Sequence, residues 1–482
     1  MNGDFDWMTV YPELTLAGLI VSLLLLEAVF RPRRLRPSLG YLSLFGCLLV
    51  LCLALIEWRQ STGQSLRGMV LLDAYAAFFD ILLLAGTALV LLLSVQDLSY
   101  RSDYREEHYP LLLLATLGTM VMVCAGDLIL LLTGMELTWL ALTVLAGMEW
   151  QRPAANEASL KLFVTGVFAS GLLFYGTSLI YGEVGSTGLR ALGEHLRSVD
   201  SAAWGLLLPG MGLLFAGFAI KIGWVPFQMW IPDVLEGTTV PVSALLSYGP
   251  KAAGFAVLGR ILLCGTGLDE PAWTALLQGL AVATTVGGYL LALNQRNLRR
   301  VLAYAGVAHS GYILLGLTLS TSIGLTSALF LLVGYGLAGI GSLAVLVVYC
   351  HEEGNGLLSD YQGLMSRHPW IGAAMILFML SLAGLPPTAG FVGRLYLLYA
   401  LVEVEQIGLA FLSGLGVLLG AYVHLKVVVH LFATVPEDGV LSLVDAPEGL
   451  ATLLLTALGT LALGLWPGPL IDVVRIAVAT VM

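Results

Sequence analysis

The chain has 482 residues, of which 58% are hydrophobic and 11% are charged, and its mean hydropathy is +0.90. Soluble globular chains have about 45–50% apolar and about 25% charged residues, and a chain this apolar cannot cover itself with polar surface. These values exclude soluble domains, a secreted disulfide scaffold and a disordered chain. The net charge of −10, with only 22 Lys plus Arg, offers no basic face for nucleic acid. The composition therefore predicts a polytopic membrane protein in contact with the lipid bilayer.

Apolar segments long enough to cross a bilayer, about 20 residues each, follow one another along the chain. They predict an all-α polytopic membrane protein with about fourteen transmembrane helices. The fourteen segments cover 11–30, 39–57, 71–95, 110–126, 127–148, 158–182, 203–236, 240–264, 272–293, 301–318, 323–350, 369–402, 407–432 and 447–468. The acidic N-terminus lacks the positive charge of a signal peptide, so we expect the first segment to be a retained anchor.

The arginines of the loops predict the orientation in the membrane. Fourteen spans place both termini on one side. The loops after odd-numbered spans carry eleven arginines, namely Arg31, Arg33, Arg34, Arg36, Arg101, Arg105, Arg152, Arg296, Arg299, Arg300 and Arg367. The opposite side carries five, Arg59, Arg67, Arg190, Arg197 and Arg475. Positive residues favour the cytoplasm, so we expect both termini on the outer face.

Two of the segments are longer than a membrane requires and contain prolines. The seventh has Pro226 and Pro232, and the twelfth has Pro386 and Pro387. Proline kinks or breaks a helix, and interrupted helices at corresponding places in two halves are typical of inverted-repeat transporters. Two unrelated proline kinks are the alternative. The repeat divides the chain into an N-terminal three-helix segment (1–109), a first five-helix repeat (110–264), a second (265–435), and a C-terminal helix and tail (436–482).

A glutamate and a lysine at mid-membrane form the first candidate site. Glu136 lies in the middle of the fifth segment, in LLTGMELTWLALTVLAGM. A lone buried charge costs about 2.5–3.5 kcal/mol on insertion scales, so Glu136 needs a partner, and Lys221, just before the first break, is the natural candidate. Such a pair can switch between paired and unpaired states, which suits the movement of a proton. A static bridge between two helices is the alternative.

Lys251 and His309 are the next candidates along the chain. Lys251 lies midway along the eighth segment, behind Pro250, in SYGPKAAGFAVLGR. Burial disfavours the charged form of lysine and allows it to release a proton near neutral pH, whereas snorkelling to the membrane surface is difficult from the centre. His309, in LAYAGVAHSGYILLG, can relay a proton between its two nitrogens; a satisfied core histidine is the alternative.

The second half of the chain carries two further buried cations. Arg394 follows the double-proline break, and Lys426 lies toward the inner end of the thirteenth segment, in AYVHLKVVVHLF. Under the repeat, Lys221 corresponds to Arg394 and Lys251 to Lys426. Each half then presents one cation on its broken helix and another on the next helix.

Three other ionisable residues within the apolar segments are further candidates. Lys161 and Arg260 are close to segment ends, where snorkelling competes with a functional role. Asp80, inside the third segment, is a candidate for contact with a neighbouring subunit.

Motifs of soluble catalysis and redox chemistry are missing from the sequence. It has no GxxxxGK[ST] or HExxH motif. Its five cysteines form no CxxC pair, so we expect no zinc or iron–sulfur site on this chain.

Several motifs resemble one known family. The stretch KIGWVPFQMWIPDVLEGTTVPVSALLSYGPKAAGF resembles the central signature of the antiporter-like, proton-translocating subunits of respiratory complex I (NADH:quinone oxidoreductase). Its second part, PVSALLSYGPKAAGF, is most similar to the subunit N branch of that family. Similarity to the same branch continues in NLRRVLAYAGVAHSGYILLG, LLSDYQGLMSRHPW and LAGLPPTAGFVGRLYLL. The resemblance extends over about residues 70–435.

The resemblance assigns roles by position. It implies that Glu136 is the glutamate of span five, Lys221 the lysine of span seven, Lys251 the central lysine and His309 the histidine of span ten. The subunit N branch usually has lysine where this chain has Arg394. Because arginine stays protonated in proteins, a proton-releasing role is not expected at that position.

The resemblance also implies partners and cofactors. It places a fourteen-helix subunit in the bacterial plasma (inner) membrane, beside a neighbouring antiporter-like subunit and small membrane subunits, and without the long lateral helix of the family's distal member. NADH, FMN, iron–sulfur clusters and quinone belong to partner subunits. Two alternatives stay open: a subunit of a multi-subunit cation/proton antiporter, and a non-pumping membrane scaffold subunit.

Overall fold

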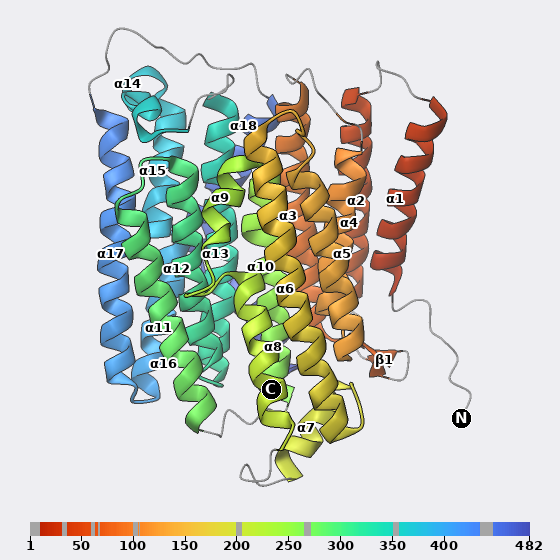
Figure 1. Cartoon of the computed structure of the whole chain (residues 1–482). Helices are drawn as coiled ribbons and strands as arrows, with labels where there is room; N and C mark the ends of the chain where they lie inside the picture. The colour runs from red at the N-terminus through yellow and green to blue at the C-terminus, as the bar shows by residue number, and fades with distance from the viewer. Residues whose placement is uncertain are drawn as a thin grey trace.

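The computed structural model describes residues 10–30, 36–58, 63–65, 68–99, 105, 107–198, 205–264, 271–349, 356–433 and 447–482. Long helices run side by side and form one bundle (Figure 1). The N-terminal elements are α1 (Tyr11–Phe30), α2 (Arg36–Glu57), β1 (Gly63–Ser65), β2 (Val70–Leu72) and α3 (Ala74–Ser99). Of the loop arginines, Arg31, Arg33, Arg34, Arg59, Arg67 and Arg101 lie outside the described residues.

Two longer sets of helices follow, and a helical pair completes the chain. The first set is α4 (His108–Val123), α5 (Leu128–Ala146), α6 (Pro153–Val184), α7 (Leu189–Ser198), α8 (Leu207–Ile222), α9 (Trp230–Gly237) and α10 (Val240–Cys264). The second is α11 (Pro271–Leu293), α12 (Leu298–Leu317), α13 (Ser322–Tyr349), η4 (Leu358–Tyr361), α14 (Leu364–Arg367), α15 (Pro369–Ala383), α16 (Ala389–Glu403) and α17 (Ile407–Phe432). The final pair is α18 (Pro447–Leu465) and α19 (Gly468–Ala479).

Every apolar segment predicted from the sequence contains a helix or two half-helices. The bounds of α1, α10 and α17 agree with the prediction, and the others differ by a few residues. Among the described residues, nine helices are long and apolar enough to cross a membrane, and α4, α8 and α15 are shorter apolar helices. The chain is therefore a polytopic, mainly helical membrane protein.

The mainly helical structure fits the all-α prediction, and one short β-hairpin accompanies the helices. β1 and β2 pair antiparallel, with Gly63 opposite Leu72. Strands of three residues are too short to produce a recognisable alternation of apolar and polar residues. The sequence analysis did not predict α7, a short amphipathic helix at one end of the bundle (Figure 1). This helix buries Leu189, Leu192 and Leu196.

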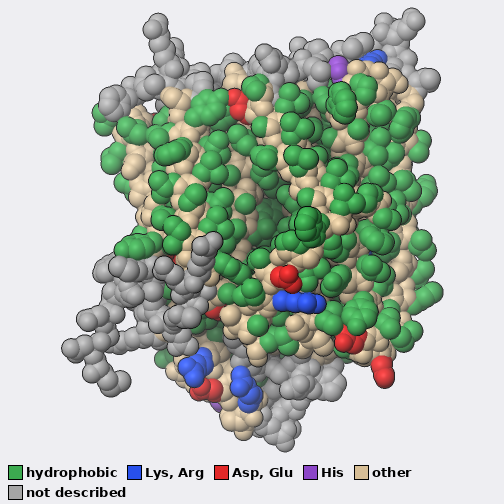
Figure 2. All heavy atoms as spheres, turned by 180° about the vertical axis from the view of Figure 1, so that it is seen from behind, with side chains coloured by type: hydrophobic (Ala, Val, Ile, Leu, Met, Phe, Trp, Pro, Cys, Tyr) green, Lys and Arg blue, Asp and Glu red, His purple; other side chains and the backbone are tan. Residues whose placement is uncertain are grey.

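The outer surface is that of a protein embedded in lipid or in other membrane subunits. Figure 2 shows a face covered almost entirely by hydrophobic side chains, with few charged ones. Phe45 and Leu418, for example, are 66% and 68% exposed. Trp370, 88% exposed, lies in the first turn of α15, where aromatic side chains mark the membrane–water boundary.

Two helices are interrupted where the prolines predict. A break separates α8 from α9, and another separates α15 from α16. Each begins with a glycine in the left-handed region, Gly223 with φ +81° and Gly384 with φ +78°, a conformation that a Cβ would disfavour. A helix that ends inside the bundle leaves carbonyls without partners. At the first break, Trp230 Nε1 donates to the carbonyl of Ile220 over 3.0 Å.

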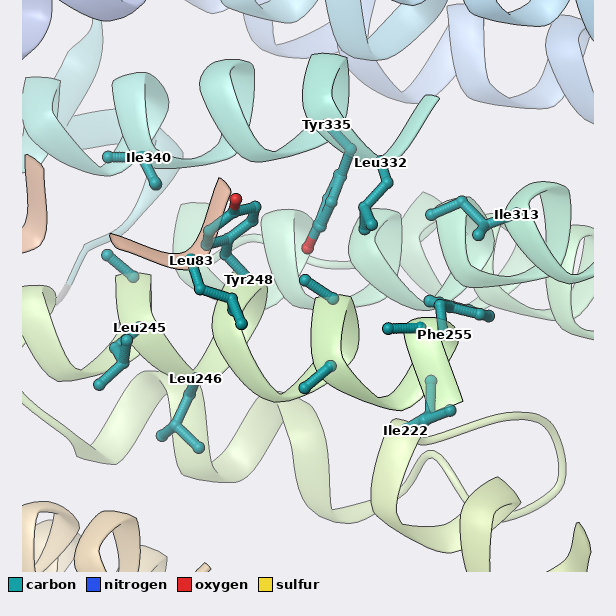
Figure 3. Packing of buried hydrophobic residues seen from close by; sticks show 14 of the residues in the cluster. Leu83, Ile222, Leu245, Leu246, Tyr248, Phe255, Ile313, Leu332, Tyr335 and Ile340 are labelled. Atoms are coloured by element: carbon teal, nitrogen blue, oxygen red, sulfur yellow. The ribbon is translucent and has the colours of Figure 1, made fainter. Parts of the chain in front are cut away.

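The centre of the bundle is formed by α10 and α13. In α13, 89% of the most apolar stretch is buried inside the protein. Tyr335 points from α13 toward α10 in Figure 3, and its hydroxyl donates to the carbonyl of Ser247 over 3.2 Å. This packing places the middle of α10, which carries Lys251, between the two interrupted helices.

Candidate functional site

Glu136 on α5 and Lys221 on α8 form the ion pair that the sequence predicts. Lys221 Nζ lies 3.2 Å from Glu136 Oε1, and Ser170 Oγ donates to the same oxygen over 2.5 Å. The Lys221 side chain is 4% exposed and that of Glu136 is 27% exposed. Lys221 Nζ also lies 4.3 Å from the centre of the Trp139 ring. The carboxylate therefore keeps a hydrogen-bond donor, and the ammonium keeps an aromatic neighbour, when the two separate.

A small internal cavity joins this pair to α10. Its volume is about 10 Å³, and its wall is formed by Met122, Met135, Thr138, Trp139, Phe218, Lys221, Ile222, Pro250 and Gly254. A space of this size accommodates about one water molecule. Lys221 lines the cavity on one side, and Pro250 and Gly254 of α10, the helix that carries Lys251, line it on another.

Lys251 is buried in the middle of α10, with 5% of its surface exposed. Its Nζ lies 5.5 Å from the centre of the Tyr335 ring. A Cβ at position 306 of α12 would approach Nζ to 3.0 Å, so Gly306 allows the backbone of α12 to pass beside the ammonium. Among the described residues, no carboxylate forms a salt bridge with Lys251. A buried ammonium without an anion is unfavourable unless it can lose its proton.

His309 continues the polar row on α12. Its ring stacks on Tyr335, with the ring centres 5.1 Å apart. Its Nδ1 lies 2.8 Å from the carbonyl oxygen of Ala305, and its Nε2 lies 3.2 Å from Arg394 Nη2. A carbonyl can only accept and a guanidinium can only donate. The contacts therefore fit the neutral imidazole with its hydrogen on Nδ1.

Arg394 on α16 occupies the second break and is 3% exposed. Its Nη2 donates to the hydroxyl of Tyr289 over 2.9 Å and to the carbonyl of Leu382 over 2.5 Å, while Nη1 donates to the carbonyl of Ala383. The two carbonyls belong to the last turn of α15, where a cation also interacts favourably with the helix dipole. Arg394 thus caps the interrupted helix and contacts His309 with the same group.

The two cations of the interrupted helices differ in sequence register. Lys221 precedes Gly223 by two residues, whereas Arg394 follows Gly384 by ten. The guanidinium nevertheless reaches back to the carbonyl of Leu382, which also precedes its glycine by two residues. Each break therefore has a positive group near the end of its first half-helix, although the two residues come from opposite sides of their breaks.

Glu136, Lys221, Lys251, His309 and Arg394 are called the buried row below. Lys426 contacts backbone carbonyls and none of these side chains. Its Nζ donates to the carbonyls of Leu293 and Gln295, over 2.9 and 3.4 Å, and its side chain is partly exposed. These carbonyls belong to the C-terminal end of α11, where a cation acts as a cap.

Two residues beside the buried row were absent from the sequence-based prediction. His424, two positions before Lys426, is fully buried, and its ring centre lies 6.0 Å from that of Tyr289 and 6.4 Å from that of His309. His424 could have been predicted from the sequence, because an ionisable residue in the middle of an apolar membrane helix indicates a functional site. Tyr289 gives no such signal, because aromatic residues are common in apolar helices.

The remaining ionisable candidates have structural contacts. Lys161 pairs with Asp233 over 2.6 Å and with Glu157 over 2.5 Å. Because Asp233 also pairs with Arg300 over 2.8 Å, this network ties α6, α9 and α12 together. It holds the second half of the first interrupted helix in place.

Arg260 and Asp80 are both buried inside the bundle. Arg260 does not snorkel: it is 2% exposed, and its Nη1 and Nη2 each donate to Asp73 over 2.6 Å. Asp80 is 3% exposed, and its Oδ1 has no hydrogen-bond partner within the described chain. Its burial corrects the expectation that Asp80 contacts a neighbouring subunit, because its own chain covers the side chain.

These features define a class of protein. Apolar helices, two of them interrupted inside the bundle, surround a buried row of lysine, histidine and arginine side chains with one carboxylate. Ionisable groups at membrane depth and interrupted helices are typical of proteins that move ions. The fold and site are those of an antiporter-like membrane subunit.

Comparison with known proteins specifies the family. Residues 125–420 match the family model described as "NADH:quinone oxidoreductase/Mrp antiporter, TM". A relative from Trichlorobacter lovleyi, named NADH-quinone oxidoreductase subunit N, is 39% identical over 97% of this chain and 96% of its own length. The chain belongs to the family of NADH:quinone oxidoreductase and Mrp antiporter transmembrane subunits.

Solved structures share the fold. A chain of respiratory complex I from Thermus thermophilus superposes with a TM-score of 0.80 at 29% identity, covering 96% of this chain and 98% of that one. A chain of the Mrp complex from Dietzia superposes with a TM-score of 0.81 at 23% identity, covering 99% and 98%. The second likeness is one of fold alone.

Proposed function

We propose that this chain is the subunit N type of membrane subunit in a complex I type NADH:quinone oxidoreductase, and that it translocates protons. The observation that carries the proposal is the buried row from Glu136 through Lys221, Lys251 and His309 to Arg394. The relative named subunit N, with 39% identity over nearly the whole of both chains, supports the choice of complex.

The proton path begins at the ion pair. When Lys221 is paired with Glu136, its charge is stabilised; when the pair opens, burial favours release of its proton. The small cavity beside Lys221 provides room for a water molecule between this residue and the Lys251 region of α10. A water molecule in this cavity can accept the proton released by Lys221 and carry it toward α10.

The second half of the path is controlled by Arg394. While its Nη2 holds His309 Nε2, the imidazole has no free site for an additional proton. His309 accepts a proton only when Arg394 moves, so the contact acts as a gate. Lys426, which lies on α17 and contacts the C-terminal end of α11, is a further proposed member of the path.

The proposed architecture follows the sequence prediction: fourteen spans, with inverted repeats at 110–264 and 265–435 between the three-helix segment 1–109 and the C-terminal part 436–482. α1 begins, and the chain ends, at the same end of the bundle (Figure 1). This supports an even number of crossings, and the loop arginines favour the outer face for both termini.

The driving chemistry lies in partner subunits under this proposal. This chain holds no redox centre, and NADH, FMN, iron–sulfur clusters and quinone belong to other subunits. Its direct partners in the bacterial inner membrane are a neighbouring antiporter-like subunit and small membrane subunits. The broad apolar surface in Figure 2 provides the area for such contacts and for lipid.

Purification and reconstitution test the proposal. The chain is expected to co-purify with flavin and iron–sulfur subunits, and vesicles that contain the complex are expected to acidify or alkalinise their interior when NADH reduces quinone. Co-purification in a redox-free exchanger would instead establish the cation/proton antiporter. Normal pumping after loss of Lys221 and Lys251 would establish a scaffold role.

A further inference from the structure

We infer that His424 carries protons at the far end of the buried path, beyond Arg394. The inference rests on the proposed function and extends it to a residue outside the predicted path.

The position of His424 on α17 is unusual for a polar side chain. This helix has an exposed apolar face, on which Leu418, Tyr422 and Val429 are 68%, 63% and 67% exposed. His424 is fully buried on the inner face. An imidazole inside a membrane bundle is unfavourable without compensating contacts, and such residues commonly mark ion pathways.

The tyrosines and histidines around His424 are packed closely. The rings of Tyr289 and His424 are 6.0 Å apart at 84°, and those of His309 and His424 are 6.4 Å apart at 81°. A Cβ at position 420 would lie 2.7 Å from Tyr289 Cζ and 2.9 Å from its hydroxyl. Gly420 therefore allows Tyr289 to reach α17 one turn before His424.

The hydrogen bonds of His424 leave one nitrogen available. Its Nδ1 donates to the carbonyl of Gly420 over 2.6 Å, so in the neutral ring Nε2 is an acceptor. Nε2 is buried and has no partner among the described residues, and the same holds for Arg394 Nε. Tyr289 accepts a hydrogen bond from Arg394 over 2.9 Å, which leaves its own hydroxyl hydrogen free to donate.

These groups complement one another. Tyr289 and Arg394 Nε present donors, His424 Nε2 presents an acceptor, and buried polar groups of this kind are usually joined directly or through one ordered water. A proton that arrives by way of the Tyr289 hydroxyl, or of a water bonded to it, binds Nε2 and forms an imidazolium. The proton then leaves from Nε2, while the Nδ1 hydrogen bond to Gly420 persists.

Charges near His424 make this protonation transient. The neighbouring polar groups are Tyr289 from α11 and His309 from α12, and Arg394 from α16 contacts both of them. Arg394 contributes a fixed positive charge, which disfavours a second cation in the cluster. His424 therefore passes its proton on rather than storing it.

The test uses the assembled complex in vesicles, with proton translocation measured per NADH oxidised and the amount of intact complex determined separately. His424→Gln retains polar groups but cannot carry a proton, and it is expected to lose the same share of translocation as Lys251→Met. His430→Gln is the matched control, because His430 on the same helix also hydrogen-bonds the carbonyl four residues earlier, over 2.7 Å, but is partly exposed. It is expected to pump normally.

A second variant guards against failed assembly. Tyr289→Phe keeps the ring and removes only the hydroxyl, and it is expected to lower translocation as His424→Gln does. A purely structural role for His424 would lower the amount of complex and leave the protons translocated per NADH unchanged. Normal translocation in both variants, with a loss in Lys251→Met, overturns the role of His424 alone. Normal translocation in Lys251→Met as well overturns the proposed function.

Discussion

Arg394 and His309 share a hydrogen bond in which Nη2 donates to Nε2 over 3.2 Å. Nε2 accepts this hydrogen bond and Nδ1 donates to the carbonyl of Ala305. The two contacts together determine the tautomer of the imidazole, with its hydrogen on Nδ1. At an effective dielectric of about 20, two unit charges about 4 Å apart repel by about 4 kcal/mol. A proton on His309 is therefore strongly disfavoured while the contact lasts.

Replacement of Arg394 separates its charge from its hydrogen bonds. Lysine keeps the positive charge of arginine but has one donating nitrogen instead of two. Because the charge is kept, Arg394→Lys is expected to retain most proton translocation. Arg394→Ala leaves His309 Nε2 and two helix-end carbonyls without a donor, at about 1–3 kcal/mol for each buried group, and is expected to lose much of it. Translocation relative to quinone reduction in vesicles is the measurement. Normal pumping by an assembled alanine variant would show that Arg394 only packs.

The Glu136–Lys221 pair predicts a loss of pumping from either side. Glu136→Gln removes the anion that stabilises the buried ammonium, and Lys221→Ala leaves the carboxylate with Ser170 as its described donor. Both variants are expected to impair quinone-coupled proton translocation. The matched control is Glu157→Gln, since Glu157 is exposed and Lys161 retains Asp233 as a second partner. Wild-type turnover and pumping in the Glu136 and Lys221 variants would contradict a switchable pair.

Lys251 provides a sharper distinction between charge and proton exchange. Arginine keeps the positive charge but does not deprotonate in proteins, whereas methionine removes both. If Lys251 exchanges its proton during turnover, Lys251→Arg and Lys251→Met both lose translocation. Pumping by the arginine variant at the wild-type level, with loss in the methionine variant, would mean that a fixed charge suffices. Initial rates of pH change in vesicles, per intact complex, decide between them.

The helices were predictable from the sequence for a simple physical reason. A span must be apolar over about 20 residues to lie in lipid, and this signal is local. The breaks at Gly223 and Gly384 were predictable as well, because each is followed by prolines that disfavour a continuous helix. The hairpin of β1 and β2 was not, because its short strands depend on contacts between strands rather than on a pattern within them.

The sequence was sufficient to predict which residues are candidates for the site, but not which residues each of them contacts. A charged residue within an apolar segment is visible in the sequence itself, so Lys221 and Arg394 were predictable as candidates. Their contacts depend on the rotation of each helix about its axis. His424 and Lys426 are two residues apart, about 200° around an α-helix: one joins the buried cluster and the other caps α11.

The buried pair of Arg260 and Asp73 is predicted to stabilise the fold rather than to move protons. Arg260 contacts Asp73 through two nitrogens, each over 2.6 Å, and Asp73 Oδ1 also accepts from the backbone amide of Ala76 over 2.8 Å, in the first turn of α3. Removing one partner of a fully buried pair costs about 3–5 kcal/mol; the cost is smaller here because Asp73 is 23% exposed, but Arg260→Ala is still expected to lower the thermal midpoint and the yield of the isolated subunit.

The exposed pair of Arg190 and Glu194 on α7 provides the matched control. Its side chains are 78% and 68% exposed and lie 3.3 Å apart, and exposed pairs contribute about 0–1 kcal/mol. Arg190→Ala is therefore expected to leave the thermal midpoint nearly unchanged. Within any Arg260→Ala complex that assembles, the protons translocated per NADH should match the wild type, because Arg260 is held by Asp73 and lies outside the buried row. A lowered ratio at normal stability would instead place Arg260 on the proton path.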